Sequence, residues 1–197
     1  MQGLKSLVVL PLVLACSSVV DESSIAAGSL ELTQAAQQCF EPGADATLDS
    51  TEPDKNFGAE GRCQVDAEPL KRCLLRWDLS AVPLGRKVAS AFVELHVPDA
   101  SRSYYAALPL LAPWTESDVT WEGAPENDKA KLFKFRGHPG DHTSFLTPEG
   151  VAQVQAWIDA PETNYGVVIP SRDTHRMALL TKESGAAQGT RLCINFR

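Results

Sequence analysis

The sequence lacks the features that mark several common protein classes. Its longest apolar run, Leu7–Ala15, has nine residues, whereas a helix needs about 20 to span a bilayer. It contains no Gly-x-Ser-x-Gly, no glycine-rich phosphate loop and no His-Glu-x-x-His. Acidic residues outnumber basic ones, 25 to 18, so the chain has no general attraction to nucleic acid. These absences argue against an enzyme and against a nucleic-acid-binding protein.

The short apolar run at the N-terminus is typical of a secretory signal. It follows Lys5 and ends in Leu-Val-Leu-Ala-Cys, which resembles a bacterial lipobox. We therefore expect residues 1–15 to be a signal peptide, with cleavage before Cys16 and lipid attachment to its thiol. Cleavage further on, near residues 26–28, is the alternative. Ser17 after the cysteine favours the outer membrane, so we expect an exported protein that is anchored there or lies at the cell surface.

Four cysteines remain once Cys16 is assigned to lipid, and an even number in an exported domain predicts two disulfides. Cys63 and Cys73 flank a charged turn and would face each other across a hairpin. Cys39 precedes the first predicted strand, and Cys193 lies in the last one. If the terminal strands are neighbours, the pairs are Cys63–Cys73 and Cys39–Cys193. A metal site is the alternative, but there is no Cys-x-x-Cys spacing.

The remaining sequence predicts a tether followed by one β domain. Residues 16–37 mix small and polar residues without periodicity, and we interpret them as the lipidated N-terminus and a flexible tether. Residues 38–197 suffice for a single domain. Their alternating segments, bounded by Pro and Gly turns, predict an all-β fold, an antiparallel β-sandwich or jelly roll. The predicted strands are Ala44–Asp49, Gly61–Asp66, Lys71–Asp78, Val88–Val97, Tyr104–Leu111, Val119–Trp121, Leu132–Phe135, Tyr165–Pro170, Arg176–Thr181 and Thr190–Phe196.

One segment departs from this alternation. Thr147, Pro148 and Glu149 have the order of an N-cap, a first-turn proline and a first-turn acid. Apolar residues then recur at spacings of three and four, up to Trp157 and Ile158. The pattern predicts a short helix near residues 148–160.

Six short motifs occur in a fixed order along the predicted domain. They are Asn56-Phe57-Gly58, the Arg-Trp-Asp-Leu-Ser-Ala-Val-Pro run of residues 76–83, Val88-Ala89-Ser90-Ala91, the Trp-Thr-Glu-Ser-Asp-Val-Thr-Trp run of residues 114–121, Val154-Gln155-Ala156-Trp157 and Asn164-Tyr165-Gly166. Together they resemble the DNRLRE (disaggregatase-related) domain, which is counted as carbohydrate-binding module family 96. Glu149-Gly150-Val151 departs from the family's Asp-Val-Thr, and the paired cysteines are an addition. The resemblance implies a noncatalytic β-sandwich that binds polysaccharide or serves as a surface structural module.

Sugar recognition requires an apolar ring face and planar hydrogen-bonding groups, and arginine suits uronate carboxylates. One of the two adjacent tyrosines must point outward from a regular strand. The predicted ligand-binding residues are Tyr104, Tyr105, Arg72, Arg76, Arg172 and Arg176. The alternative is that the arginines are solvated strand residues, while the tryptophans anchor the core.

Acidic residues gather beside the first predicted turn: Asp45, Asp49, Glu52 and Asp54. Oxygen ligands from loops suit calcium, but the spacing matches no defined calcium loop. We predict no cofactor, with calcium at Asp45, Asp49 and Asp54 as the alternative.

Two functions remain. The first is a lipid-anchored, noncatalytic module that binds polysaccharide, an acidic one being a candidate. The second is a structural or adhesion subunit of the cell envelope whose partners are proteins.

Overall fold

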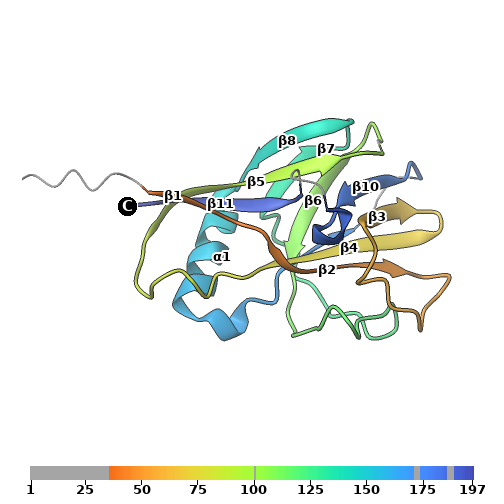
Figure 1. Cartoon of the computed structure of the whole chain (residues 1–197), viewed down its shortest axis with the longest axis horizontal. Helices are drawn as coiled ribbons and strands as arrows, with labels where there is room; N and C mark the ends of the chain where they lie inside the picture. The colour runs from red at the N-terminus through yellow and green to blue at the C-terminus, as the bar shows by residue number, and fades with distance from the viewer. Residues whose placement is uncertain (1–35, 100, 171–173, 186–188) are drawn as a thin grey trace, which may run out of the picture. The chain divides into compact units, whose positions relative to one another are not determined.

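The computed structural model describes residues 36–99, 101–170, 174–185 and 189–197. Its antiparallel strands form two sheets accompanied by one α-helix (Figure 1), as the all-β sandwich prediction requires. The predicted signal peptide, Cys16 and Arg172 lie outside the described residues. No helix within the described ranges is long and apolar enough to cross a membrane.

The two sheets differ in size. The four-stranded sheet has the order β1 (Gln37–Phe40), β11 (Arg191–Phe196), β5 (Val88–Val97) and β8 (Gly140–Phe145). The seven-stranded sheet has the order β10 (Met177–Leu180), β3 (Arg62–Ala67), β4 (Leu70–Trp77), β9 (Val167–Pro170), β6 (Tyr104–Pro109) and β7 (Phe133–Arg136), and β2 (Pro42–Asp49) pairs with β4. Two short 3₁₀ helices, η1 (Pro161–Thr163) and η2 (Lys182–Ser184), lie in connections.

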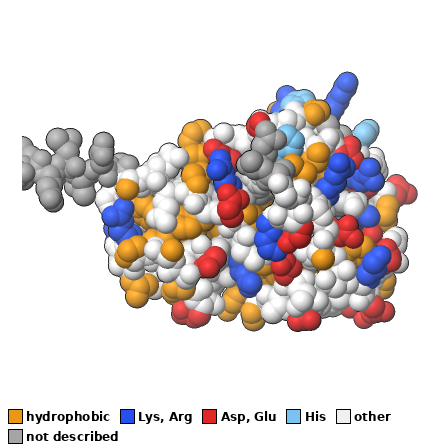
Figure 2. All heavy atoms as spheres, in the orientation of Figure 1, with side chains coloured by type: hydrophobic (Ala, Val, Ile, Leu, Met, Phe, Trp, Pro, Cys, Tyr) orange, Lys and Arg blue, Asp and Glu red, His pale blue; other side chains and the backbone are white. Residues whose placement is uncertain are grey.

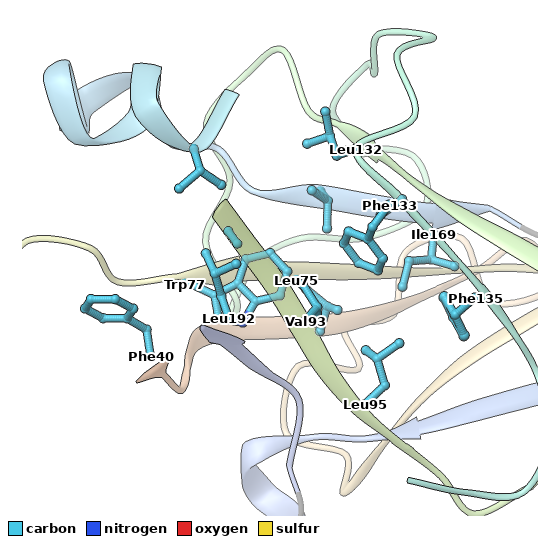
Figure 3. Packing of buried hydrophobic residues seen from close by; sticks show 14 of the residues in the cluster. Phe40, Leu75, Trp77, Val93, Leu95, Leu132, Phe133, Phe135, Ile169 and Leu192 are labelled. Atoms are coloured by element: carbon cyan, nitrogen blue, oxygen red, sulfur yellow. The ribbon is translucent and has the colours of Figure 1, made fainter. Parts of the chain in front are cut away.

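Strand β4 is buried on both faces. Leu75 and Trp77 point into the main core between the sheets, together with Val93 of β5 (Figure 3). Leu74 points the other way, into a second cluster formed with β2 and with the segment of residues 110–126. The predicted alternation is therefore correct, but the outward face is covered rather than exposed.

The strand prediction omits two strands and assigns one wrongly. Strand β1 was not predicted, because it is short and largely polar and lies at the edge of its sheet as the structure describes it. Strand β8 was not predicted either, because it begins with a glycine and its buried position is Ser144 rather than a large apolar residue. Val119–Trp121 is not a strand. The Val119 amide instead donates to the carbonyl of Thr115 at 3.0 Å and closes a turn.

Both predicted disulfides are present, Cys39–Cys193 and Cys63–Cys73. The first joins directly opposed residues of β1 and β11. The second does not span a regular hairpin as predicted. The β3–β4 ladder contains two residue pairs near the turn, and Cys63 itself pairs with Leu179 of β10. The disulfide thus links β3 to β4 where the two strands diverge.

The predicted helix is α1 (Pro148–Asp159). The Thr147 hydroxyl caps it by accepting from the Gly150 amide at 3.1 Å. A Cβ at Gly150 would lie 2.3 Å from the Leu132 carbonyl oxygen, so only glycine allows this close approach. Trp157 and Ile158 are buried and close one end of the main core.

Candidate functional site

The predicted ligand-binding residues do not form one site. Arg72 and Arg76 project from β4 toward the second cluster, where each guanidinium lies over a tryptophan ring. The distances to the ring centres are 4.8 Å for Arg72 over Trp121 and 5.3 Å for Arg76 over Trp114. Arg76 Nη1 also donates to the Trp114 carbonyl at 3.0 Å. Both arginines therefore hold the 114–121 segment against the sheet.

Two further residues of the predicted set already have partners within the chain. Arg176 donates to Asp99 Oδ2 from Nε and Nη2, at 3.2 and 2.9 Å. Tyr105 is buried, and its hydroxyl lies 2.6 Å from Ser101 Oγ and 3.2 Å from the carbonyl oxygen of His175. The Tyr105 side chain is therefore closed to a ligand, whereas the Arg176 side chain is 58% exposed and is held in an ion pair at the surface.

Tyr104 is the member of the predicted set that presents a ring to solvent, with 70% of its surface exposed. It lies on β6, opposite Arg136 of β7, and Ala106 lies opposite Lys134. Directly opposed residues of antiparallel strands project from the same face of a sheet. The Arg136 guanidinium lies 4.8 Å from the centre of the Tyr104 ring. An exposed ring and two cations thus share the outer face near the β7 edge of the seven-stranded sheet.

A shallow depression of about 270 Å³ adjoins this ring, and we call it the Tyr104 groove. Its lining comprises Tyr104, Tyr105, Ala106, Leu108, Lys131, Lys134 and Pro170. None of these described lining residues is acidic. The groove therefore combines an aromatic wall, a small apolar floor and positive charge.

The alternating pattern of β7 indicates where Lys134 and Arg136 lie, although neither was among the predicted ligand-binding residues. Phe133 and Phe135 are buried while Lys134 and Arg136 are exposed, so the Phe-Lys-Phe-Arg order places the two cations on one outer face. The pairing of β7 with β6, which brings them to Tyr104, could not be read from this alternation.

Two other depressions are less suited to an anionic ligand. The larger, about 440 Å³, lies near the C-terminal end of α1 and includes Asp78 and Glu162 beside Arg76. The other, about 250 Å³, lies on the outer face of the four-stranded sheet. There the guanidinium of Arg191 is already paired with Glu94, with its Nε at 2.9 Å.

The predicted calcium residues are dispersed. Asp49 forms an ion pair with Lys71 at 2.8 Å and accepts from the Thr51 amide at 2.9 Å. Burial acts to raise the pKa of Asp49, but Lys71 and Thr51 outweigh it and hold this pKa below its usual value. Asp54 is exposed. Asp45 instead lies with Glu116 and Glu183.

The space around the Glu116 backbone is tightly filled. The Asn56 amide donates to the carbonyl oxygens of Glu116 and Val119 at 2.7 and 2.8 Å. A Cβ at Gly58 would lie 2.2 Å from the Glu116 oxygen. The Asn-Phe-Gly motif therefore positions the 114–121 segment rather than a ligand.

The chain matches a known family. The sequence model of carbohydrate-binding module family 96 matches residues 36–195, a range that extends from β1 into β11. No curated protein matches the chain.

Proposed function

Since the chain belongs to carbohydrate-binding module family 96, we propose that its domain binds a polysaccharide without cleaving it and that the Tyr104 groove holds the sugar. The observation that carries this assignment is the 70% exposed ring of Tyr104 beside Arg136 and the groove lysines. A pyranose can place its apolar face on such a ring while its polar groups meet the cations.

The charges favour an acidic polysaccharide. The whole chain has a net charge of −7, which repels a polyanion at long range. Lys131, Lys134 and Arg136 offset this repulsion locally, and the planar guanidinium of Arg136 can pair with a uronate carboxylate through two parallel hydrogen bonds. A shallow groove buries little ligand, so we expect Kd values of about micromolar to millimolar.

We further propose that a lipid on Cys16 anchors the module to the outer membrane. The two disulfides support an oxidising location, because such bonds persist in exported proteins. The anchored protein should partition into detergent, and the N-terminal peptide of the mature chain should carry acyl groups on Cys16. A water-soluble mature chain that begins beyond residue 20 would disprove the anchor.

A structural or adhesion subunit with protein partners is the second candidate. Phe145 is 70% exposed on the outer face of the four-stranded sheet, and its ring centre lies 5.7 Å from that of Phe92. An exposed ring that packs against a half-buried one is also suited to contact with a partner protein.

Affinity electrophoresis in gels that contain neutral or uronate polysaccharides separates the two candidates. At least one uronate polysaccharide should retard the protein. Tyr104→Ala should weaken the affinity measured from this retardation about two- to tenfold, which corresponds to the loss of one aromatic contact. Phe145→Ala is the matched control, because its ring is exposed to the same extent. Equal loss in both variants would reject the Tyr104 groove, and no retardation in any gel would favour the adhesion role.

A further inference from the structure

Three carboxylates from distant parts of the sequence meet beside β2. They belong to Asp45 of β2, Glu116 of the 114–121 segment and Glu183 of η2. One oxygen from each lies within 4.8 Å of the others. We call this group the Asp45 cluster. It involves none of the residues that line the Tyr104 groove.

The buried carboxylate of Asp45 has too few hydrogen-bond partners. The residue is 1% exposed, and within the described part of the chain its Oδ1 has no hydrogen-bond partner. Its Oδ2 accepts one long hydrogen bond, 3.3 Å, from the Lys182 amide. Burial, and then the nearby charge of Glu183, raise the pKa of Asp45 to about 7. A buried carboxylate oxygen without a partner is costly and indicates a missing cation or donor.

Lys182 bridges the other two carboxylates of the cluster. Its ammonium nitrogen lies 2.6 Å from both oxygens of Glu116 and also contacts Glu183. One ammonium therefore faces three carboxylates in the described structure. The Lys182 side chain is 30% exposed, and its long stem can carry the ammonium into solvent without disturbing the fold.

We propose that the Asp45 cluster is a calcium site, with Asp45, Glu116 and Glu183 as ligands and Lys182 as the counter-cation that calcium displaces. The ligands are all oxygens, which hard cations prefer. Calcium binds oxygens at about 2.3–2.6 Å, so two ligands of one ion can lie up to about 5 Å apart, whereas magnesium limits this distance to about 4.2 Å. The cluster oxygens lie within 4.8 Å of one another, a spacing that one calcium ion can span. The flexible coordination of calcium also suits ligands from three separate segments better than the strict octahedron of magnesium does.

The site also has access to solvent. The side chains of Glu116 and Glu183 are 26% and 24% exposed, so water can complete the six to eight ligands that calcium takes. A bound ion would tie β2, the 114–121 segment and η2 together. Because an unfolded chain does not bring these residues together, calcium should stabilise the folded state by mass action.

Thermal unfolding of the full chain tests the proposal. The protein is treated with chelator, dialysed, and unfolded over a series of calcium concentrations at constant ionic strength, with magnesium in parallel. Calcium at a concentration of about 100 times its Kd should raise Tm by roughly 5–10 °C. Magnesium at the same concentration should raise Tm less. Isothermal titration with calcium chloride measures the binding directly.

Two variants and a control make the test specific. Glu183→Gln should weaken calcium binding about tenfold, because the site loses a charged ligand. Glu162→Gln removes an exposed acid on η1 and should leave calcium binding unchanged. Lys182→Gln should lower Tm without calcium but show a larger rise with it, because the competing ammonium is gone. No calcium response in the unaltered chain or in Lys182→Gln, or equal responses in Glu183→Gln and Glu162→Gln, would overturn the proposal.

Discussion

The guanidinium of Arg72 lies 4.8 Å from the centre of the Trp121 ring, and its Nε is buried without a hydrogen-bond partner in the described structure. Arg76, on the same face of β4, covers Trp114 in the same manner. The two tryptophans delimit the most distinctive motif of the chain. This motif is therefore a cover for the second cluster, and its arginine partners on β4 stabilise the fold.

Replacing Arg72 should consequently affect stability rather than binding. We expect Arg72→Ala to lower the free energy of unfolding by about 1–2 kcal/mol, because a partly desolvated cation–π contact is lost. Retardation by polysaccharide gels should not change. Urea unfolding followed by tryptophan fluorescence measures the loss, with Arg62→Ala, an exposed residue of β3, as the control. A stable variant that no longer binds polysaccharide would contradict this assignment.

Salt should weaken binding of an acidic polysaccharide at the Tyr104 groove. Exposed charge pairs are screened beyond about 8 Å at physiological ionic strength, so Kd should rise steadily between low and high salt. Changing Lys131, Lys134 and Arg136 together to Gln should weaken binding at low salt and remove most of the salt dependence. Affinity measurements at several salt concentrations test this. A triple variant with an unchanged salt dependence would place the anionic ligand elsewhere.

The two disulfides should differ in their access to reductant. Cys39 is exposed, whereas Cys63 and Cys73 are both 0% exposed. Thiolate attack requires access to a sulfur, so mild reduction of the native protein should open Cys39–Cys193 first. Cys63–Cys73 should react only when the domain unfolds. Differential alkylation followed by peptide mapping tests the order, and simultaneous opening of both bonds would show that burial does not control it.

Asp49 should contribute to stability at neutral pH and lose this contribution in acid. Its pKa in the folded protein is lowered from 3.8, so the folded state favours the charged form. The stabilisation is complete above the unfolded-state pKa and is lost as pH falls through the lower folded-state pKa. We expect Asp49→Asn to cost roughly 1–3 kcal/mol at pH 7, because the hydrogen bond to Lys71 loses its charge.

Urea unfolding of both proteins from pH 7 to pH 2 measures this dependence. The difference between Asp49→Asn and the unaltered chain should remain constant down to about pH 5 and shrink below pH 4. Asp54→Asn, at an exposed position on the loop that follows β2, is the control. A difference that grows in acid would reverse the sign and refute the role of Lys71.

Much of the fold followed from local patterns, because these depend on which residues are buried. The period of two in β4 identified Leu75 and Trp77 as core residues, and the spacing in α1 identified Trp157 and Ile158. The same alternation could not reveal that the 110–126 segment covers the outer face of β4. The sequence therefore predicts that Arg72 and Arg76 can meet a ligand, whereas in the structure a tryptophan ring covers each guanidinium group.

The candidate site was only partly predictable for a related reason. Because side chains alternate between the two faces of a strand, either Tyr104 or Tyr105 had to point outward. In the structure Tyr104 is exposed and Tyr105 is buried. Its neighbour Arg136 is more than 30 residues away in sequence and is brought to it by the register of β6 and β7. Likewise, Asp45 was noticed beside Asp49, but its partners Glu116 and Glu183 come from distant loops. Short-range spacing carries no information about such contacts.

The position of the Cys39–Cys193 bond has a mechanical consequence. Among the described strands, β1 pairs with β11 alone, and Cys39↔Cys193 is the third of the four residue pairs between them. A pull on the chain ahead of β1 would otherwise break the ladder one pair at a time, as a zipper opens. With the disulfide in place, only the pairs of Gln37 and Gln38 can peel away. Further load passes through a covalent bond into β11, so drag on a captured polymer could be borne without detaching the first strand.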